Sequence, residues 1–144
     1  MKRLFMLLFV VLALLFTTAP SVQATSDSKT VRFNSSTTLT GNVWIQPFAK
    51  GGCGRYSTSV VSNRVLRTVT NKTTAHPYGI GANAWGLSAS GPGGSTYTTW
   101  TNSNRKGSYL SGNVCMNWTT IYLGMSVDGT GNYNGAVRTV AARV

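Results

Sequence analysis

Acid–base catalysis in this chain could draw on His76, Asp27 and Asp128, because the sequence has one His, two Asp and no Glu. Such catalysis needs a group that titrates near the working pH, usually a His or a tuned carboxylate. The pair Asp128-Gly129 is typical of a hairpin turn, and Asp27 lies in an N-terminus that we expect to fray. His76 precedes Pro77 in what we interpret as a loop with an exposed ring. We therefore predict no catalytic residues and a protein that is not an enzyme. A hydrolase or a nuclease working through His76 is the alternative, although no nucleophile motif supports it.

Metal binding and thiol chemistry depend on Cys53 and Cys115, the only cysteines. Two cysteines and a lone His are a poor ligand set for a metal, so we predict no metal and no cofactor. Both cysteines follow an apparent export signal, and exported proteins meet an oxidising environment. We predict a disulfide between them, which would bring the turn at 51–54 close to the segment that ends at Cys115.

The first 24 residues have the pattern of a secretory signal peptide. Two basic residues precede Leu4–Phe16, an unbroken apolar run of 13 residues, and small residues stand at positions −3 and −1 of a cleavage point before Thr25. As a helix this run would rise about 20 Å, less than the roughly 30 Å of a hydrocarbon core. We predict that residues 1–24 are cleaved and that 25–144 form a single secreted β domain without a transmembrane segment. A membrane anchor is the alternative.

Charge is the strongest functional indication in the sequence. Two of the thirteen basic residues lie in the signal segment, so the expected domain keeps eleven against two acids. Such an excess attracts polyanions, which predicts anionic envelope polymers or lipids as partners. Nucleic acid would bind only non-specifically, since no base-reading motif is present. The residues that we predict to bind anions, from the densest basic stretches, are Arg64, Arg67, Lys72, Arg105 and Lys106.

Aromatic residues supply a second candidate contact. Tyr and Trp combine an apolar face with a polar tip, which suits sugar surfaces and membrane interfaces. We predict Trp85, Trp100, Tyr97 and Tyr133 as contact residues. Of these, we expect Trp85, Trp100 and Tyr133 to be exposed. We expect Trp44 and Trp118 to be largely buried.

The segment Gly79–Gly94 consists almost entirely of small residues, with Trp85 and Leu87 as its large apolar side chains. A connection of this length usually has a use in a compact domain. It is either a flexible surface loop, or one whose Trp85 plugs the end of the domain, or a mobile segment that presents Trp85 to a membrane or a ligand.

Alternation with a period of two residues governs the rest of the chain and predicts strands. In the clearest case, 118–127, we expect Ile121, Leu123, Met125 and Val127 to face the core. Turns follow at Asp128-Gly129 and Asn134-Gly135. The other expected strands lie around 31–33 and over 38–46, 96–102, 108–115 and 136–141, with a bent strand or two short ones over 60–69, where a helix is the alternative.

These elements predict an all-β fold: a single-domain antiparallel β-sandwich or small barrel of about seven strands with one disulfide. The leading hypothesis for function is a secreted cationic protein, antimicrobial or toxin-like, that binds anionic cell envelopes. The alternatives are a non-lytic cell-wall or polysaccharide-binding module, and an extracellular enzyme inhibitor that uses the loop at 50–55. Oligomeric state is outside what the sequence predicts.

Overall fold

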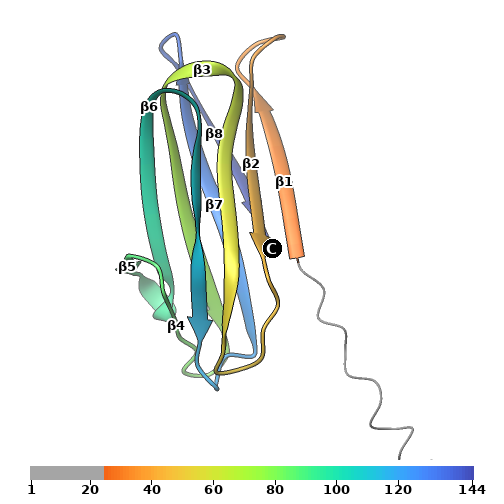
Figure 1. Cartoon of the computed structure of the whole chain (residues 1–144), viewed down its shortest axis with the longest axis vertical. Helices are drawn as coiled ribbons and strands as arrows, with labels where there is room; N and C mark the ends of the chain where they lie inside the picture. Colours follow the sequence, from red (N-terminus) through yellow and green to blue (C-terminus); the bar gives the residue numbers. More distant parts are fainter. Residues whose placement is uncertain (1–24) are drawn as a thin grey trace, which may run out of the picture.

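The computed structural model describes residues 25–144, and the expected signal peptide lies outside this part of the chain. The described residues form one curled antiparallel sheet (Figure 1). Its strands are β1 (Thr25–Arg32), β2 (Thr38–Ile45), β3 (Cys53–Tyr78), β4 (Ala84–Trp85), β5 (Ala89–Ser90), β6 (Thr96–Met116), β7 (Tyr122–Tyr133) and β8 (Ala136–Arg143), with a short 3₁₀ turn at Pro92–Gly94. The predicted all-β antiparallel fold is therefore confirmed.

The sheet folds over on itself because β3 and β6 are long and bend together. The first part of β3 pairs with β2 and with the second part of β6. Beyond the bend, β3 pairs with the first part of β6 and with β7, which in turn pairs with β8. The result is two facing layers joined through the β3 and β6 arches, which lie at the upper end of the molecule in Figure 1.

Both bends have a local cause. The β3–β6 register is interrupted between Val61 and Leu66, and Asn104 in β6 adopts a positive φ of 55°, which Asn tolerates better than most residues. The segment 60–69 is thus a bent strand, as predicted. The strands expected at 96–102 and 108–115 are instead the two arms of β6.

The core lies between the layers, and it explains why Asp128-Gly129 is not a turn. Gly129 lies inside β7, opposite Asn71 of β3 and Val140 of β8. A Cβ on Gly129 would come within 2.6 Å of the Val60 side chain in the facing layer. This glycine permits close approach of two layers, and the predicted turn there is wrong. The turn at Asn134-Gly135 is confirmed, with φ values of 51° and 86°.

The predicted core face of β7 is confirmed only in its middle. Leu123, Met125 and Val127 are buried. Ile121 and Trp118 precede the strand and are exposed by 71% and 78%, so the burial predicted for both is wrong. Their backbone forms the turn that precedes β7, where strand alternation no longer decides burial. Trp44 is half-buried on the outer face of β2 rather than in the core.

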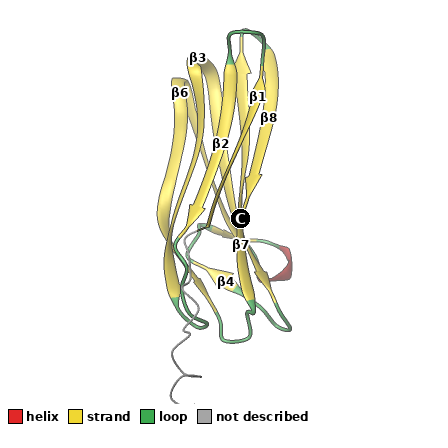
Figure 2. Cartoon of the chain, turned by 90° about the vertical axis from the view of Figure 1, so that its right-hand side faces the viewer, coloured by secondary structure: helices red, strands yellow, loops and turns green. Residues whose placement is uncertain are grey.

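The edge strands of the two layers, β1 and β8, lie against each other, and a side-chain hydrogen bond links them. Figure 2 shows β1 and β8 side by side. Asp27 of β1 accepts a hydrogen bond of 3.1 Å from the backbone N–H of Arg143 in β8 and lies 3.6 Å from the Lys29 ammonium. These donors lower the pKa of Asp27, the Arg143 N–H contributing most. The N-terminal segment is thus paired from Thr25 onward, contrary to the fraying that we expected.

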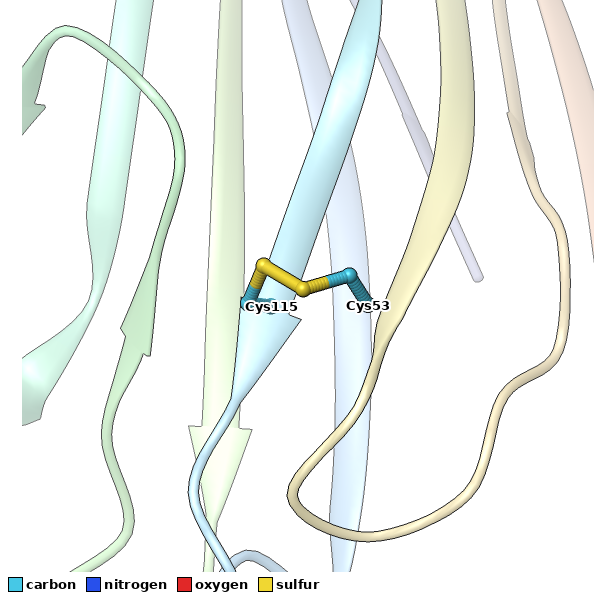
Figure 3. The surroundings of a disulfide bond; sticks show 2 residues. All are labelled: Cys53 and Cys115. Carbon is cyan, nitrogen blue, oxygen red and sulfur yellow. A yellow bond between two sulfur atoms is a disulfide. The ribbon is translucent and has the colours of Figure 1, made fainter.

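The disulfide joins Cys53 at the start of β3 to Cys115 near the end of β6 (Figure 3). The two residues face each other in register, with their Cα atoms 4.0 Å apart. This confirms the predicted pairing and brings the 51–54 turn against the end of β6, where the Met116 N–H donates to the Gly52 carbonyl.

The segment Gly79–Gly94 is held against the sheet. Trp85 in β4 pairs with Cys115, and Ala89 in β5 pairs with Tyr97. A Cβ on Gly86 would lie 2.5 Å from the Asn113 carbonyl oxygen, so the glycine allows this contact.

Between Thr25 and Val144 the fold contains no helix of the length and apolar character needed to cross a membrane.

Candidate binding surfaces

The end of the molecule formed by the β3 and β6 arches is strongly basic. Arg64 lies within the bend of β3 and Arg67 directly after it, and Arg105 and Lys106 occupy the bend of β6, where Arg105 pairs with Leu66. Two further basic residues lie at the same end: Arg32 is the last residue of β1, and Arg138 is the third residue of β8. All are exposed. We call this surface the cationic end: Arg32, Arg64, Arg67, Arg105, Lys106 and Arg138.

No carboxylate neutralises the cationic end within residues 25–144. Asp27 lies five strand positions from Arg32 along β1, and Asp128 pairs with Lys72, five positions from Arg67 along β3. At about 3.3 Å per residue, each separation is about 17 Å. That is about twice the Debye length of about 8 Å at physiological ionic strength. The positive field around the β3 and β6 arches is therefore little reduced by either acid. Arg138 is nearer to an acid, since it lies three positions along β8, about 10 Å, from the register partner of Asp128.

Hydrogen bonds fix the backbone segments that present these cations. Asn63 accepts from the Thr38 N–H at 3.0 Å and donates to the Ser36 carbonyl at 2.8 Å, which joins the β3 arch to the β1–β2 loop. Asn102 donates to the Gly107 carbonyl at 3.0 Å and so closes the bend of β6. The basic side chains of the two arches thus project from turns that hydrogen bonds hold in place.

Lys72, the fifth basic residue that we predicted to bind anions, is not part of this end. It lies in the middle of the outer face of the layer formed by β6, β3, β7 and β8, in register with Thr99 and Asp128. Its ammonium nitrogen is 5.2 Å from the centre of the Tyr97 ring. The Lys72 charge is thus engaged locally by cation–π attraction to Tyr97.

The aromatic residues predicted as contacts do not form one surface. Trp100 is 56% exposed on β6, with its Nε1 donating to Asn102 at 3.0 Å. Trp85 is 47% exposed and lies on β4, far from the cationic end. Tyr133 is half-buried, since it packs against Phe33 with ring centroids 5.9 Å apart. The exposure predicted for Tyr133 is therefore wrong, because the loop after β1 covers it.

A groove on the outer face of the other layer was not predicted. It is open, has a volume of about 390 Å³ and is lined by Trp44 and polar residues that include Ser26, Asp27, Asn42, Ser57 and Ser59. Asn42 accepts from Ser28 at 2.8 Å and donates to Ser59 at 2.9 Å, so its amide orientation is set. Val43 and Ile45 alternate with Trp44 in β2. Assigning these two aliphatic residues to the core would have predicted that Trp44 faces outward.

His76 lies in β3 and is half-buried, not in an exposed loop. Its Nε2 shares a hydrogen bond of 2.9 Å with the Ser126 hydroxyl. Burial lowers the pKa of His76, and Arg143 lowers it further, while Asp128 opposes the shift. Within residues 25–144 no carboxylate oxygen is hydrogen-bonded to this ring, and no three His, Cys, Asp or Glu side chains gather as a metal site.

A comparison of the chain with protein-family models, curated proteins and solved structures found no match. Inferences about function therefore rest on the geometry and charge of the surfaces themselves.

Proposed function

We propose that this protein is an exported cationic protein that binds the anionic polymers of cell envelopes through its cationic end. The observation that carries the proposal is the gathering of six exposed basic side chains at one end, with Asp27 and Asp128 about 17 Å along the strands from Arg32 and Arg67. A polymer with repeated phosphates can contact several of these side chains at once, since Arg forms paired hydrogen bonds with phosphate oxygens. Adsorption to a target cell in this way is the first step of the antimicrobial or toxin-like role.

The test compares two variants that lose the same charge from different places. One replaces Arg64, Arg67, Arg105 and Lys106 by Ser. The control replaces Lys50, Arg55, Lys72 and Arg143 by Ser, which lowers the net charge equally but leaves the cationic end intact.

Binding to purified wall teichoic acid is measured as a function of salt concentration. We expect the first variant to bind at least about tenfold more weakly and with a smaller salt dependence, because it loses phosphate contacts and the counterions that they release. The control should keep most of the affinity. Equal weakening of both variants would mean that net charge alone drives binding, and the localised site would be abandoned.

The groove beside Trp44 favours a second candidate, a polysaccharide-binding module. An indole next to fixed hydroxyl and amide groups suits a sugar ring, which stacks on the aromatic face and exchanges hydrogen bonds at its edge. The residues that face outward into the groove beside Trp44 are Ser and Asn, which carry no charge and so favour neutral sugars over acidic ones. The variant Trp44→Ala should abolish retention on insoluble neutral glucan or chitin, whereas Trp100→Ala should not. Retention by the Trp44 variant would remove this candidate.

A further inference from the structure

The end of the molecule opposite the cationic end exposes large apolar side chains. Ile80 is 95% exposed, Trp118 78% and Ile121 71%, and Tyr78 and Tyr122 are about half-exposed beside them. We call these five residues the aromatic end. Soluble proteins seldom expose such a contiguous apolar surface unless it has a partner. Single apolar residues scattered over a surface need no explanation, so the question is whether these five form one patch.

Contacts between the segments show that they do. The rings of Tyr78 and Tyr122 stack with centroids 5.7 Å apart. The Ile121 N–H donates to the Tyr78 carbonyl at 2.8 Å. Ile80 follows Gly79, where a Cβ would lie 2.4 Å from the Thr119 carbonyl oxygen, so the two loops are in direct contact.

Trp118 joins the same surface from the other side. Its indole packs on Gly51, where a Cβ would lie 2.4 Å from the ring. Gly51 belongs to the turn before Cys53, which the disulfide fixes to β6. The exposed Trp118 side chain thus packs on a turn that the disulfide holds in place.

Several polar groups of these loops are paired within the protein, at Gly81, Asn83 and Asn117. The Gly81 carbonyl accepts from both the Asn117 amide and the Thr119 hydroxyl, each at 2.9 Å. Asn83 and Asn117 exchange two more bonds of 3.1 Å. A loop that faces water does not need this internal pairing. A loop that enters lipid does, because no water remains to satisfy its backbone.

Charge and shape further favour lipid as the occupant. The loops 46–52, 79–83 and 117–121 contain no Asp or Glu and a single basic residue, Lys50. These loops would therefore repel neither anionic nor neutral lipid headgroups. An apolar pocket of about 160 Å³ lies next to Ile121 and is lined by Ile45, Pro47, Phe48, Met116 and Leu123. It offers space for the methylene groups of an acyl chain.

We propose that the aromatic end inserts into the interfacial region of a lipid bilayer, with Ile80 and Ile121 deepest and Trp118, Tyr78 and Tyr122 at the headgroup level. Trp and Tyr prefer this level because each has an apolar ring and a polar tip. From Leu66 to Tyr78, β3 spans about 40 Å at about 3.3 Å per residue. The cationic end is thus several Debye lengths from the inserted end, and the two surfaces act independently. The protein can hold a polyanion at one end and a membrane at the other.

The experiment measures binding of the whole domain to vesicles of phosphatidylcholine in about 1 M salt, where the Debye length is about 3 Å and charge attraction is suppressed. The test variant is Ile80→Ser with Ile121→Ser. The matched control is Tyr109→Ser with Val65→Ser, which removes two exposed apolar side chains from other surfaces. Near-ultraviolet circular dichroism establishes that each variant is folded.

We expect the wild type and the control to bind alike, and the test variant to bind at least about tenfold more weakly, since each Ile loses most of its transfer free energy. The fluorescence of the wild type should shift to the blue on binding, and Trp118→Phe should remove much of that shift. Failure of the wild type to bind, or equal binding by the test variant, would overturn the proposal. So would a wild-type dimer that the test variant dissociates, because the patch would then cover a second copy. Teichoic acid binding is measured without lipid, so failure of either surface is recognised separately.

Discussion

The Nε of Arg138 donates a hydrogen bond of 3.3 Å to the backbone oxygen of Arg32, a residue 106 positions earlier in the chain. This contact joins β8 to β1 and brings two cations that are remote in sequence to the same end of the molecule. Each segment contributes one or two charges, and the basic surface exists only once the strands have paired.

Removal of the disulfide tests how much the staple stabilises the domain. The variant Cys53→Ala/Cys115→Ala should lose about 4 kcal/mol of unfolding free energy, because the bridge closes a loop with a sequence separation of 62. Urea denaturation monitored by Trp fluorescence measures this loss. An unchanged urea midpoint would show that the disulfide adds no stability beyond that of the packed layers.

Asn71 should contribute to stability through a buried polar cluster between the layers. It is fully buried, its amide oxygen accepts from Thr73 at 3.0 Å, and its nitrogen donates to Thr58 at 3.2 Å. Asn71→Ala removes the acceptor of the Thr73 hydroxyl and the donor to Thr58, and leaves these two hydroxyls only each other as partners, which should cost about 2 kcal/mol. The control Asn113→Ala, at an exposed position, should change stability by less than about 0.5 kcal/mol. Similar small effects for both would mean that water replaces the missing amide.

Gly129 should couple energetically to Val60. Gly129→Ala places a methyl group 2.6 Å from the Val60 side chain and should destabilise the fold by about 1–3 kcal/mol. A Val60→Ala background removes the closest overlaps and leaves only the Val140 methyl tight, at 3.0 Å, so the same change should cost less. A double-mutant cycle of unfolding free energies measures the coupling. Additive effects would contradict the close contact.

Stability should fall as the pH falls through the ordinary His pKa. Burial lowers the pKa of His76 from 6.5 in the folded state, so the unfolded chain binds more protons below that pH. Above about pH 7 both states are neutral at this site, and no contribution remains. The Asp27 pKa is lowered as well, but that contribution is lost only below about pH 4, where the unfolded carboxyl becomes protonated.

Thermal denaturation from pH 7.5 to 5 should therefore show a decline in the wild type that His76→Gln reduces. The variant keeps a side chain able to hydrogen-bond with Ser126 but does not titrate. An identical decline in both proteins would assign the pH dependence to other groups.

The predictions that succeeded depend on local sequence. Alternation identified the strands and the buried middle of β7, and Asn134-Gly135 marked a hairpin because its left-handed conformations favour these residues. Cys53 and Cys115 offered one possible disulfide pair. The failures share a cause: Gly129, Trp118 and Ile121 were interpreted from their neighbours in the chain, whereas their environment is set by Val60, Gly51 and the 79–83 loop.

Sequence alone determined the charge excess, the β class and the covalent staple, because composition, two-residue periodicity and cysteine count are properties of the unfolded chain as well. Tertiary structure decided where charge and apolar surface lie. The bends of β3 and β6 turn their basic residues to one end, and the loops 79–83 and 117–121 meet at the other. Such positions follow from the pairing register of strands far apart in the chain, which no local pattern specifies.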